Sequence, residues 1–244
     1  PERLAILPED KSPVTFERMA AFPEPGWNVP LAVSFSPDKK SLVYLASEGE
    51  AGLEKALFTF DLEKKAARLL LRAKDLLPTD KPLSREEELR RERTRQRTTG
   101  VTSYVWAESE NAMIVPLGGD LFFRAADGKS VQLTRTDEPE IDPKLCKKGE
   151  KVVFVRGSEL FAIDTATKKE VALTKGAPEG VTHGQSDFNG QEELDEESGF
   201  WISPTCDKVA YLEVDERKVG VHHVLGYRQK KPDLMEQKYP ASGE

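Results

Sequence analysis

The feature that most constrains the fold is a pattern of paired short strands that recurs along the chain. In the first half of each repeat, one strand leads into a polar turn, of which Ser36-Pro37-Asp38 is the clearest example, and an apolar strand follows. Repetition of one two-strand unit indicates an all-β protein assembled from copies of a supersecondary motif. The apolar strands that follow the turns are 42–45, 113–115, 152–155 and 209–212.

The second half of the repeat is an alternating strand, a turn rich in Asp, Gly and Lys, and another strand. Alternation of apolar and polar residues is typical of half-buried strands. Four strands in about 40 to 50 residues is the spacing of a β-propeller blade. We therefore predict a partial β-propeller of about four blades, each an antiparallel four-stranded sheet. A β-sandwich is the alternative, and it explains the recurring turns less well. The second halves are 57–71, 121–134 and 160–174.

One segment, about 84–97, departs from the strand pattern and predicts a helix rich in Arg and Glu. Ser84 and Glu87 have the spacing of a capping box, and acidic residues fill the first turn while arginines fill the last. Because the segment has few apolar residues, we expect it to project from a blade as an insertion. A solvated helix held by salt bridges is the plain interpretation of its charges.

Composition excludes several classes of protein. With 38% hydrophobic and 32% charged residues, the chain is typical of a globular protein, and it contains no apolar run of the roughly 20 residues that a membrane span needs. The net charge of −7 argues against a nucleic-acid partner. We predict no membrane partner, no nucleic-acid partner and no cofactor.

The ends and the cysteines carry further expectations. The chain begins with Pro1 rather than Met and shows no signal-peptide pattern, so we interpret it as a piece of a longer protein. Cys146 and Cys206 are too few for a disulfide framework, and we interpret them as unpaired thiols at strand edges or in the core. Together with the absence of an Asn-x-Ser/Thr sequon, they favour a reducing compartment.

The sequence lacks the common catalytic motifs. The sequence has no Gly-x-Ser-x-Gly elbow, no phosphate-binding Gly-x-x-x-x-Gly-Lys-Ser/Thr loop and no His-Glu-x-x-His. His183, His222 and His223 lack partners at metal-ligand spacing, so we interpret them as structural. No catalytic residue and no metal site is predicted in this chain.

Two segments are candidates for binding. Glu192 and Glu193 are adjacent carboxylates on a short loop or helical turn, and such a pair can accept hydrogen bonds from one ammonium group. Taken alone, a solvated acidic turn is the default interpretation of such a pair. The arginines near the end of the predicted helix are suited to binding a carboxylate or a peptide carbonyl.

These segments together carry a family resemblance. The run from Leu83 to Tyr104, the stretch Glu140-Ile-Asp-Pro-Lys-Leu-Cys146, and Gln191-Glu-Glu-Leu-Asp195 followed by Gly199-Phe-Trp-Ile-Ser-Pro204 closely resemble the dipeptidyl peptidase IV family. The sequence is most similar to the cytosolic branch, which contains dipeptidyl peptidases eight and nine. The resemblance covers most of residues 30–244.

The resemblance implies a fold and an activity. Residues 1–244 would form the first half of an eight-bladed propeller that caps an α/β-hydrolase domain, and the Ser-Asp-His triad would lie outside this chain. The parent would be a serine dipeptidyl aminopeptidase that releases N-terminal dipeptides, preferably after proline, and this chain alone would be inactive. Glu192 and Glu193 match the pair that binds the substrate's ammonium. Arg95 matches the arginine that contacts a substrate carbonyl by one spacing, and Arg97 matches it by another.

The resemblance also implies partners and a location. Peptides with a free N-terminus, the parent's own hydrolase domain and a second copy of the parent would be the partners. The parent would be cytoplasmic, with the periplasm or secretion as alternatives for a bacterial protein. The alternative function is a propeller without a nucleophile that serves as a protein-interaction platform, and the sequence beyond Glu244 separates the two.

Overall fold

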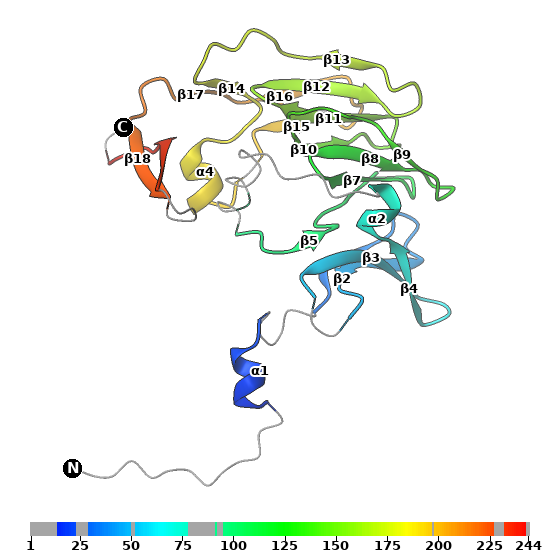
Figure 1. The fold of residues 1–244 in the computed structure, drawn as a ribbon. Coiled ribbons are helices and arrows are strands. Elements are labelled where there is room, and N and C mark those ends of the chain that lie inside the picture. The colour runs from blue at the N-terminus through cyan, green and yellow to red at the C-terminus, as the bar shows by residue number, and fades with distance from the viewer. Residues whose placement is uncertain are drawn as a thin grey trace, which may run out of the picture.

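The computed structural model describes residues 14–22, 29–49, 52–77, 91, 95–196, 198–226 and 232–242 (Figure 1). Its main feature is a series of sheets in which strands follow one another in chain order. The first sheet contains β1 (Leu31–Phe35), β2 (Ser41–Ala46), β3 (Glu54–Asp61) and β4 (Ala66–Leu71), and β5 (Thr99–Gly100) pairs in parallel with β3. Neighbouring strands from β1 to β4 are antiparallel.

The second and third sheets repeat this antiparallel meander. The second is formed by β6 (Val105–Trp106), β7 (Met113–Leu117), β8 (Asp120–Arg124) and β9 (Ser130–Gln132). The third is formed by β10 (Glu140–Leu145), β11 (Lys151–Arg156), β12 (Glu159–Asp164) and β13 (Glu170–Ala172). Four-stranded meanders of this kind are the blades of a β-propeller. The prediction of an all-β partial propeller is therefore confirmed.

The fourth repeat forms shorter pairings within the described residues. The strand β14 (Val181–His183) pairs with β17 (Glu213–Asp215), and β15 (Phe200–Ile202) pairs with β16 (Val209–Tyr211). A hairpin of β18 (Val221–Gly226) and β19 (Asp233–Lys238) follows. The helices are short: α1 (Phe16–Ala20), α2 (Ala73–Leu76) and α4 (Phe188–Glu193).

Blades pack face to face, and strand alternation decides which neighbour each side chain meets. On β7, Met113 and Val115 pack into the cluster shared with the first sheet, whereas Ile114 packs into the cluster shared with the third. On β11, Val152 and Phe154 pack toward the second sheet, while Val153 and Val155 pack with Phe200 of β15. Because both faces of these central strands are buried, their sequences are nearly continuous apolar runs.

Equivalent turns link neighbouring blades at one end of the sheets. In the first blade, the Asp38 carboxylate accepts a hydrogen bond from Asn111 Nδ2 of the second blade at 2.8 Å. Ser109 of the second blade donates from both its backbone N–H and its hydroxyl to the Lys147 carbonyl of the third. These contacts lie in the turn that joins the first two strands of each blade, which is the turn that the repeat predicts.

The same turns hold the two cysteines, and here the sequence-based interpretation is wrong. Cys146 and Cys206 form a disulfide, with Cα atoms 5.8 Å apart, so neither is an unpaired thiol. Cys146 begins the turn after β10, and Cys206 ends the turn after β15 with a φ of +55°. The packing of adjacent blades brings these turns together across 60 residues of sequence. The disulfide also removes free thiols as an argument for a reducing compartment.

The predicted helix at 84–97 lies largely outside the described residues. Arg91 is helical, and its carbonyl accepts a hydrogen bond from the Gln96 N–H at 2.8 Å. Arg95 has a φ of +53°. A left-handed residue followed by such a bond is typical of a helix end. Arg95 itself is therefore not helical, whereas the prediction extends the helix to about Arg97, and most of the predicted segment lies outside the described residues.

A buried histidine joins the third blade to the fourth repeat. His183 Nδ1 lies 2.8 Å from Glu159 Oε2 of β12, and Nε2 lies 3.2 Å from Glu213 Oε2 of β17. The hydrogen bond to Glu159, followed by that to Glu213, raises the pKa of His183 above its ordinary value. A protonated ring donates to both carboxylates.

This histidine predicts a pH-dependent stability. A pKa raised in the folded state contributes stability that is fully present below the unfolded value, about 6.5, and is lost as pH rises through the folded pKa. We expect His183→Gln to lower the melting temperature more at pH 6 than at pH 9, as measured by thermal unfolding of both proteins. An equal difference at the two pH values would contradict the proposed charge on the ring.

Candidate functional site

The acidic pair lies on an excursion that leaves the blades between Gln185 and Ser198. These two residues form an isolated antiparallel bridge, so the excursion starts and ends at the same place. Its main element is α4, which Asp187 caps by accepting a hydrogen bond from the Gly190 N–H at 2.6 Å. In Figure 1, α4 stands beside the β18 hairpin. The excursion is therefore closed at its base by this bridge and carries a short helix.

Glu192 and Glu193 occupy the last turn of α4, and both are exposed. The last turn carries no basic residue, and neither carboxylate has a hydrogen-bond or ion-pair partner among the described residues. Negative charge is unfavourable at a helix C-terminus because the dipole is negative there. The pair therefore adds no stability to α4 and leaves its acceptor atoms open to a cation.

The base of the excursion is fixed to the third blade. Gln185 Nε2 donates to the Gly157 carbonyl at 2.7 Å. The hydroxyl of Ser198 accepts a hydrogen bond from Lys144 Nζ of β10. A side chain at Gly199 would overlap the Gln185 backbone, so glycine is required where the two ends of the excursion meet.

Aromatic contacts with the region of the last hairpin also hold α4 in place. The ring of Phe188 packs against Tyr239 with centroids 5.0 Å apart, and Tyr239 in turn lies 5.8 Å from the His222 ring. Tyr239 follows β19, so the last hairpin contacts the helix that carries the acidic pair. The position of α4 therefore depends on both the third blade and the contacts around the last hairpin.

The candidate arginines lie on a different segment. Arg95 and Arg97 are both exposed, in the stretch that leads into β5. Neither side chain has a partner among the described residues. The structure leaves both arginines available for a ligand and does not choose between them.

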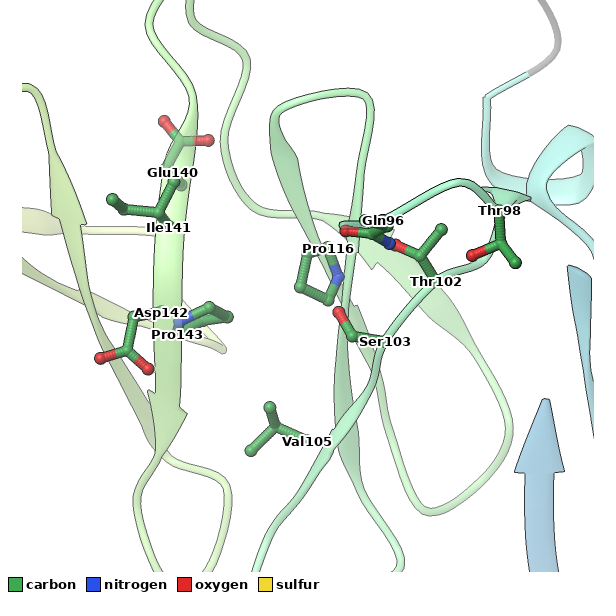
Figure 2. A pocket seen from close by; sticks show the side chains of 10 residues that line it. All are labelled: Gln96, Thr98, Thr102, Ser103, Val105, Pro116, Glu140, Ile141, Asp142 and Pro143. Atoms are coloured by element: carbon green, nitrogen blue, oxygen red, sulfur yellow. The ribbon is translucent and has the colours of Figure 1, made fainter. Parts of the chain in front are cut away.

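A cavity of about 470 Å³ lies between the start of β10 and this arginine segment. Figure 2 shows Gln96, Thr98, Thr102 and Ser103 along one wall and residues 140–143 along the other. Glu140 is unavailable to a ligand because Arg156, Thr134 and Thr136 already donate to its buried carboxylate. The rest of the lining consists of Asp142 and of uncharged polar and apolar residues.

The arginine segment borders this cavity directly, whereas no described residue of the acidic excursion is part of the lining. The chain neighbours of Arg95 and Arg97 form one wall. The other wall includes Asp142, which forms an ion pair with Lys144 at 3.6 Å, and Lys144 in turn binds the end of the acidic excursion. The structure thus connects the two segments through β10, although they are separated by about 95 residues of sequence.

Other kinds of site find no support in the part of the chain that the structure describes. No group of three or more potential metal-ligating side chains is present there. In the same residues, no helix has the length and apolarity needed to cross a membrane.

The stacked meanders and their shared cores define the class of the chain, a partial β-propeller. Residues 99–244, more than half of the chain, match the family described as the dipeptidyl peptidase IV (DPP IV) N-terminal region. The chain therefore belongs to the dipeptidyl peptidase IV family, which confirms the resemblance seen in the sequence.

Individual relatives agree with this membership. Dipeptidyl peptidase 8 from Homo sapiens is 28% identical over 243 aligned residues, which cover 85% of this chain and 27% of that protein. Dipeptidyl aminopeptidase B from Saccharomyces cerevisiae is 29% identical over 98 residues, covering 38% of this chain and 12% of that protein. The chain thus spans about a quarter of the length of dipeptidyl peptidase 8.

A solved structure supports the fold independently. The crystal structure of Porphyromonas gingivalis dipeptidyl peptidase 4 matches with a TM-score of 0.60 and 16% sequence identity. The match covers 89% of this chain and 30% of that one. At this identity the likeness bears on the fold alone.

Proposed function

We propose that this chain is the substrate-recognition part of a serine dipeptidyl aminopeptidase, in which Glu192 and Glu193 bind the free amino terminus of a peptide. The observation that carries the proposal is the exposed carboxylate pair at the end of α4, which has no partner among the described residues. Family membership supplies the chemical context, since the relatives are named as dipeptidyl peptidases and aminopeptidases.

The proposed role is one of positioning. An ammonium group offers three hydrogen-bond donors, and two ionised carboxylates provide enough acceptors to satisfy them. Two residues of extended peptide span about 7 Å, so an anchored amino terminus places the bond after the second residue at a fixed distance. An acidic pair at that distance from a nucleophile would select dipeptides as products.

The rest of the proposed parent rests on the family resemblance. Arg95 or Arg97 would contact a substrate carbonyl, since a guanidinium is suited to that acceptor. An α/β-hydrolase domain outside residues 1–244 would supply the Ser-Asp-His triad, so this chain alone would be inactive. A preference for proline before the scissile bond and a homodimeric parent are further parts of the proposal.

The cytoplasmic location now rests on the family resemblance and on the absence of an Asn-x-Ser/Thr sequon. Disulfides are typical of oxidising compartments, and the Cys146–Cys206 bond thus favours the periplasmic or secreted alternative. Alkylation of free thiols at the moment the parent is extracted from its native cells, followed by mass spectrometry, decides between the two locations. Alkylation of both Cys146 and Cys206 would support the cytoplasm, and alkylation of neither would support an oxidising compartment.

The function is tested with the full-length parent and two chromogenic substrates, Gly-Pro-p-nitroanilide and its N-acetylated form. We expect release from the free peptide, and a value of kcat/KM for the acetylated peptide that is lower by about two to three orders of magnitude, because acetylation removes the ammonium charge. Equal rates for the two substrates would contradict the amine anchor. A parent that hydrolyses neither would favour the interaction-platform alternative.

A further inference from the structure

One ammonium group holds the end of the acidic excursion. Lys144 Nζ donates hydrogen bonds to the Ser198 hydroxyl and to the Phe200 carbonyl. It also lies 4.2 Å from the centre of the Phe200 ring. The lysine side chain is three-quarters buried, so these contacts are shielded from water. Lys144 thus fixes the strand onto which the excursion returns.

A carboxylate two residues earlier on β10 completes the contact. Asp142 Oδ2 lies 3.6 Å from Lys144 Nζ and is buried without a hydrogen bond from any described residue. Burial raises the pKa of Asp142. Its backbone has a φ of +47° and sits in a bulge between Ile141 and Lys144. The bulge carries Asp142 into the wall of the cavity and Lys144 toward the excursion.

The first blade provides an internal comparison. β1 has the same irregularity, with Ala32 at a φ of +48° and a register shift before Ser34. Ala32 stands four residues before the turn residue Ser36, just as Asp142 stands four residues before Cys146. Alanine occupies this bulge in the first blade, so the backbone does not require a carboxylate there. The acid and the lysine are features of the third blade, where the acidic excursion is attached.

We propose that Asp142 and Lys144 are positioning residues that hold Glu192 and Glu193 at the correct place relative to the cavity. This inference rests on the proposed function of the acidic pair. A displacement of about 1 Å in a substrate-binding group can lower the rate by about a hundredfold. Lys144 acts through Ser198 and the base of α4 and does not itself contact the peptide.

The first test compares Lys144→Met, Lys144→Arg and Lys148→Met in the full-length parent. We expect Lys144→Met to lower kcat/KM for Gly-Pro-p-nitroanilide by about tenfold to a hundredfold, mainly through a higher KM, because the misplaced pair binds the ammonium less well. Lys144→Arg should recover most of the loss, since a guanidinium can donate to both oxygen atoms. Lys148 is an exposed lysine on the following turn, and its substitution should have no effect.

A double-mutant comparison separates positioning from general damage. If Lys144 acts through the acidic pair, Lys144→Met should change kcat/KM less than about threefold when Glu192 and Glu193 are already glutamine. The Lys144→Met single variant should also react with a fluorophosphonate probe, which has no amino group, at the same rate as the wild type. The inference would be overturned if Lys144→Met lowered kcat/KM by the same factor in the Glu192→Gln, Glu193→Gln background as in the wild type. It would also be overturned if Lys144→Met lowered probe labelling as much as it lowers kcat/KM.

Hydrogen exchange tests the inference even if the parent has no peptidase activity. The Gln191 and Glu196 amides donate to the Asp187 and Gly190 carbonyls within the excursion. In Lys144→Met these two amides should exchange at least about tenfold faster than in the wild type, whereas Lys148→Met should leave them unchanged. Unchanged exchange in Lys144→Met would overturn the positioning role, whatever the activity of the parent.

Discussion

Replacing Glu192 and Glu193 together with glutamine should lower kcat/KM of the full-length parent for Gly-Pro-p-nitroanilide by about a thousandfold. Hydrogen bonds to a charged group contribute about 1.5–3 kcal/mol each, so losing two is expected to cost about 3–6 kcal/mol. Glutamine retains the size and shape of the side chain and removes the negative charge. Steady-state kinetics on the double variant and on each single variant measure the effect.

The control for this prediction is Glu196→Gln. Glu196 is an exposed acid of the same excursion, beyond the end of α4. We expect it to change kcat/KM less than about threefold, because general attraction between exposed charges is weak. The double variant should unfold at the same temperature as the wild type or slightly above it, since it removes negative charge from a helix C-terminus. If the double variant lowered kcat/KM no more than Glu196→Gln does, the assignment of Glu192 and Glu193 would be contradicted.

Removing the disulfide should give the largest loss of stability. Closing a loop across 60 residues is worth about 4 kcal/mol in the chain-entropy account of disulfides. We expect Cys146→Ser with Cys206→Ser to lower the melting temperature of the propeller and to make the junction of the third blade with the fourth repeat more sensitive to trypsin. Differential scanning fluorimetry and limited proteolysis without reductant measure these changes.

Reduction provides the control for the disulfide. Dithiothreitol should lower the melting temperature of the wild type toward that of the double serine variant and leave the variant unchanged. This comparison separates the loss of stability caused by breaking the disulfide from the loss caused by placing a serine hydroxyl at position 146, where Cys146 is fully buried. Equal melting temperatures for the oxidised wild type and the variant would contradict a stabilising bond between these blades.

Much of the fold can be predicted from local sequence. The repeat locates the central strands of three blades, because each buries alternate side chains against different neighbours. On β7, for example, Ile114 and Val115 pack into different clusters. The repeat does not predict that the fourth unit splits into short pairings, with the excursion inserted between β14 and β15. Those pairings depend on contacts with the third blade, which local alternation does not encode.

Long-range contacts and local backbone geometry explain the errors and omissions. The link between Cys146 and Cys206 requires knowledge that two equivalent turns lie side by side, and a count of two cysteines carries no such information. The charge pattern predicts a helix to about Arg97, whereas Arg95 has a left-handed backbone that the pattern does not indicate. Both depend on geometry that residue types alone leave open.

The candidate site, like the fold, is predicted from the sequence only in part. Residue types favour a solvated acidic turn at Glu192 and Glu193, and the family resemblance changes that interpretation. Lys144 was missed as a partner of the excursion because its contacts reach Ser198, 54 residues away, and a backbone carbonyl. The Asp-Pro-Lys stretch was part of the resemblance, but its bulge and its charge pair appear only when β10 and the excursion are seen together.

The most direct test of the amine anchor is the ratio of kcat/KM for the free peptide to that for the N-acetylated peptide, measured for the wild-type parent and the Glu192→Gln, Glu193→Gln variant. We expect a ratio of about a hundred or more in the wild type. In the variant we expect a ratio near one, because an enzyme without the carboxylates gains little from the ammonium. A variant that keeps the wild-type ratio would show that the free amino terminus is recognised elsewhere and would contradict the assignment of Glu192 and Glu193.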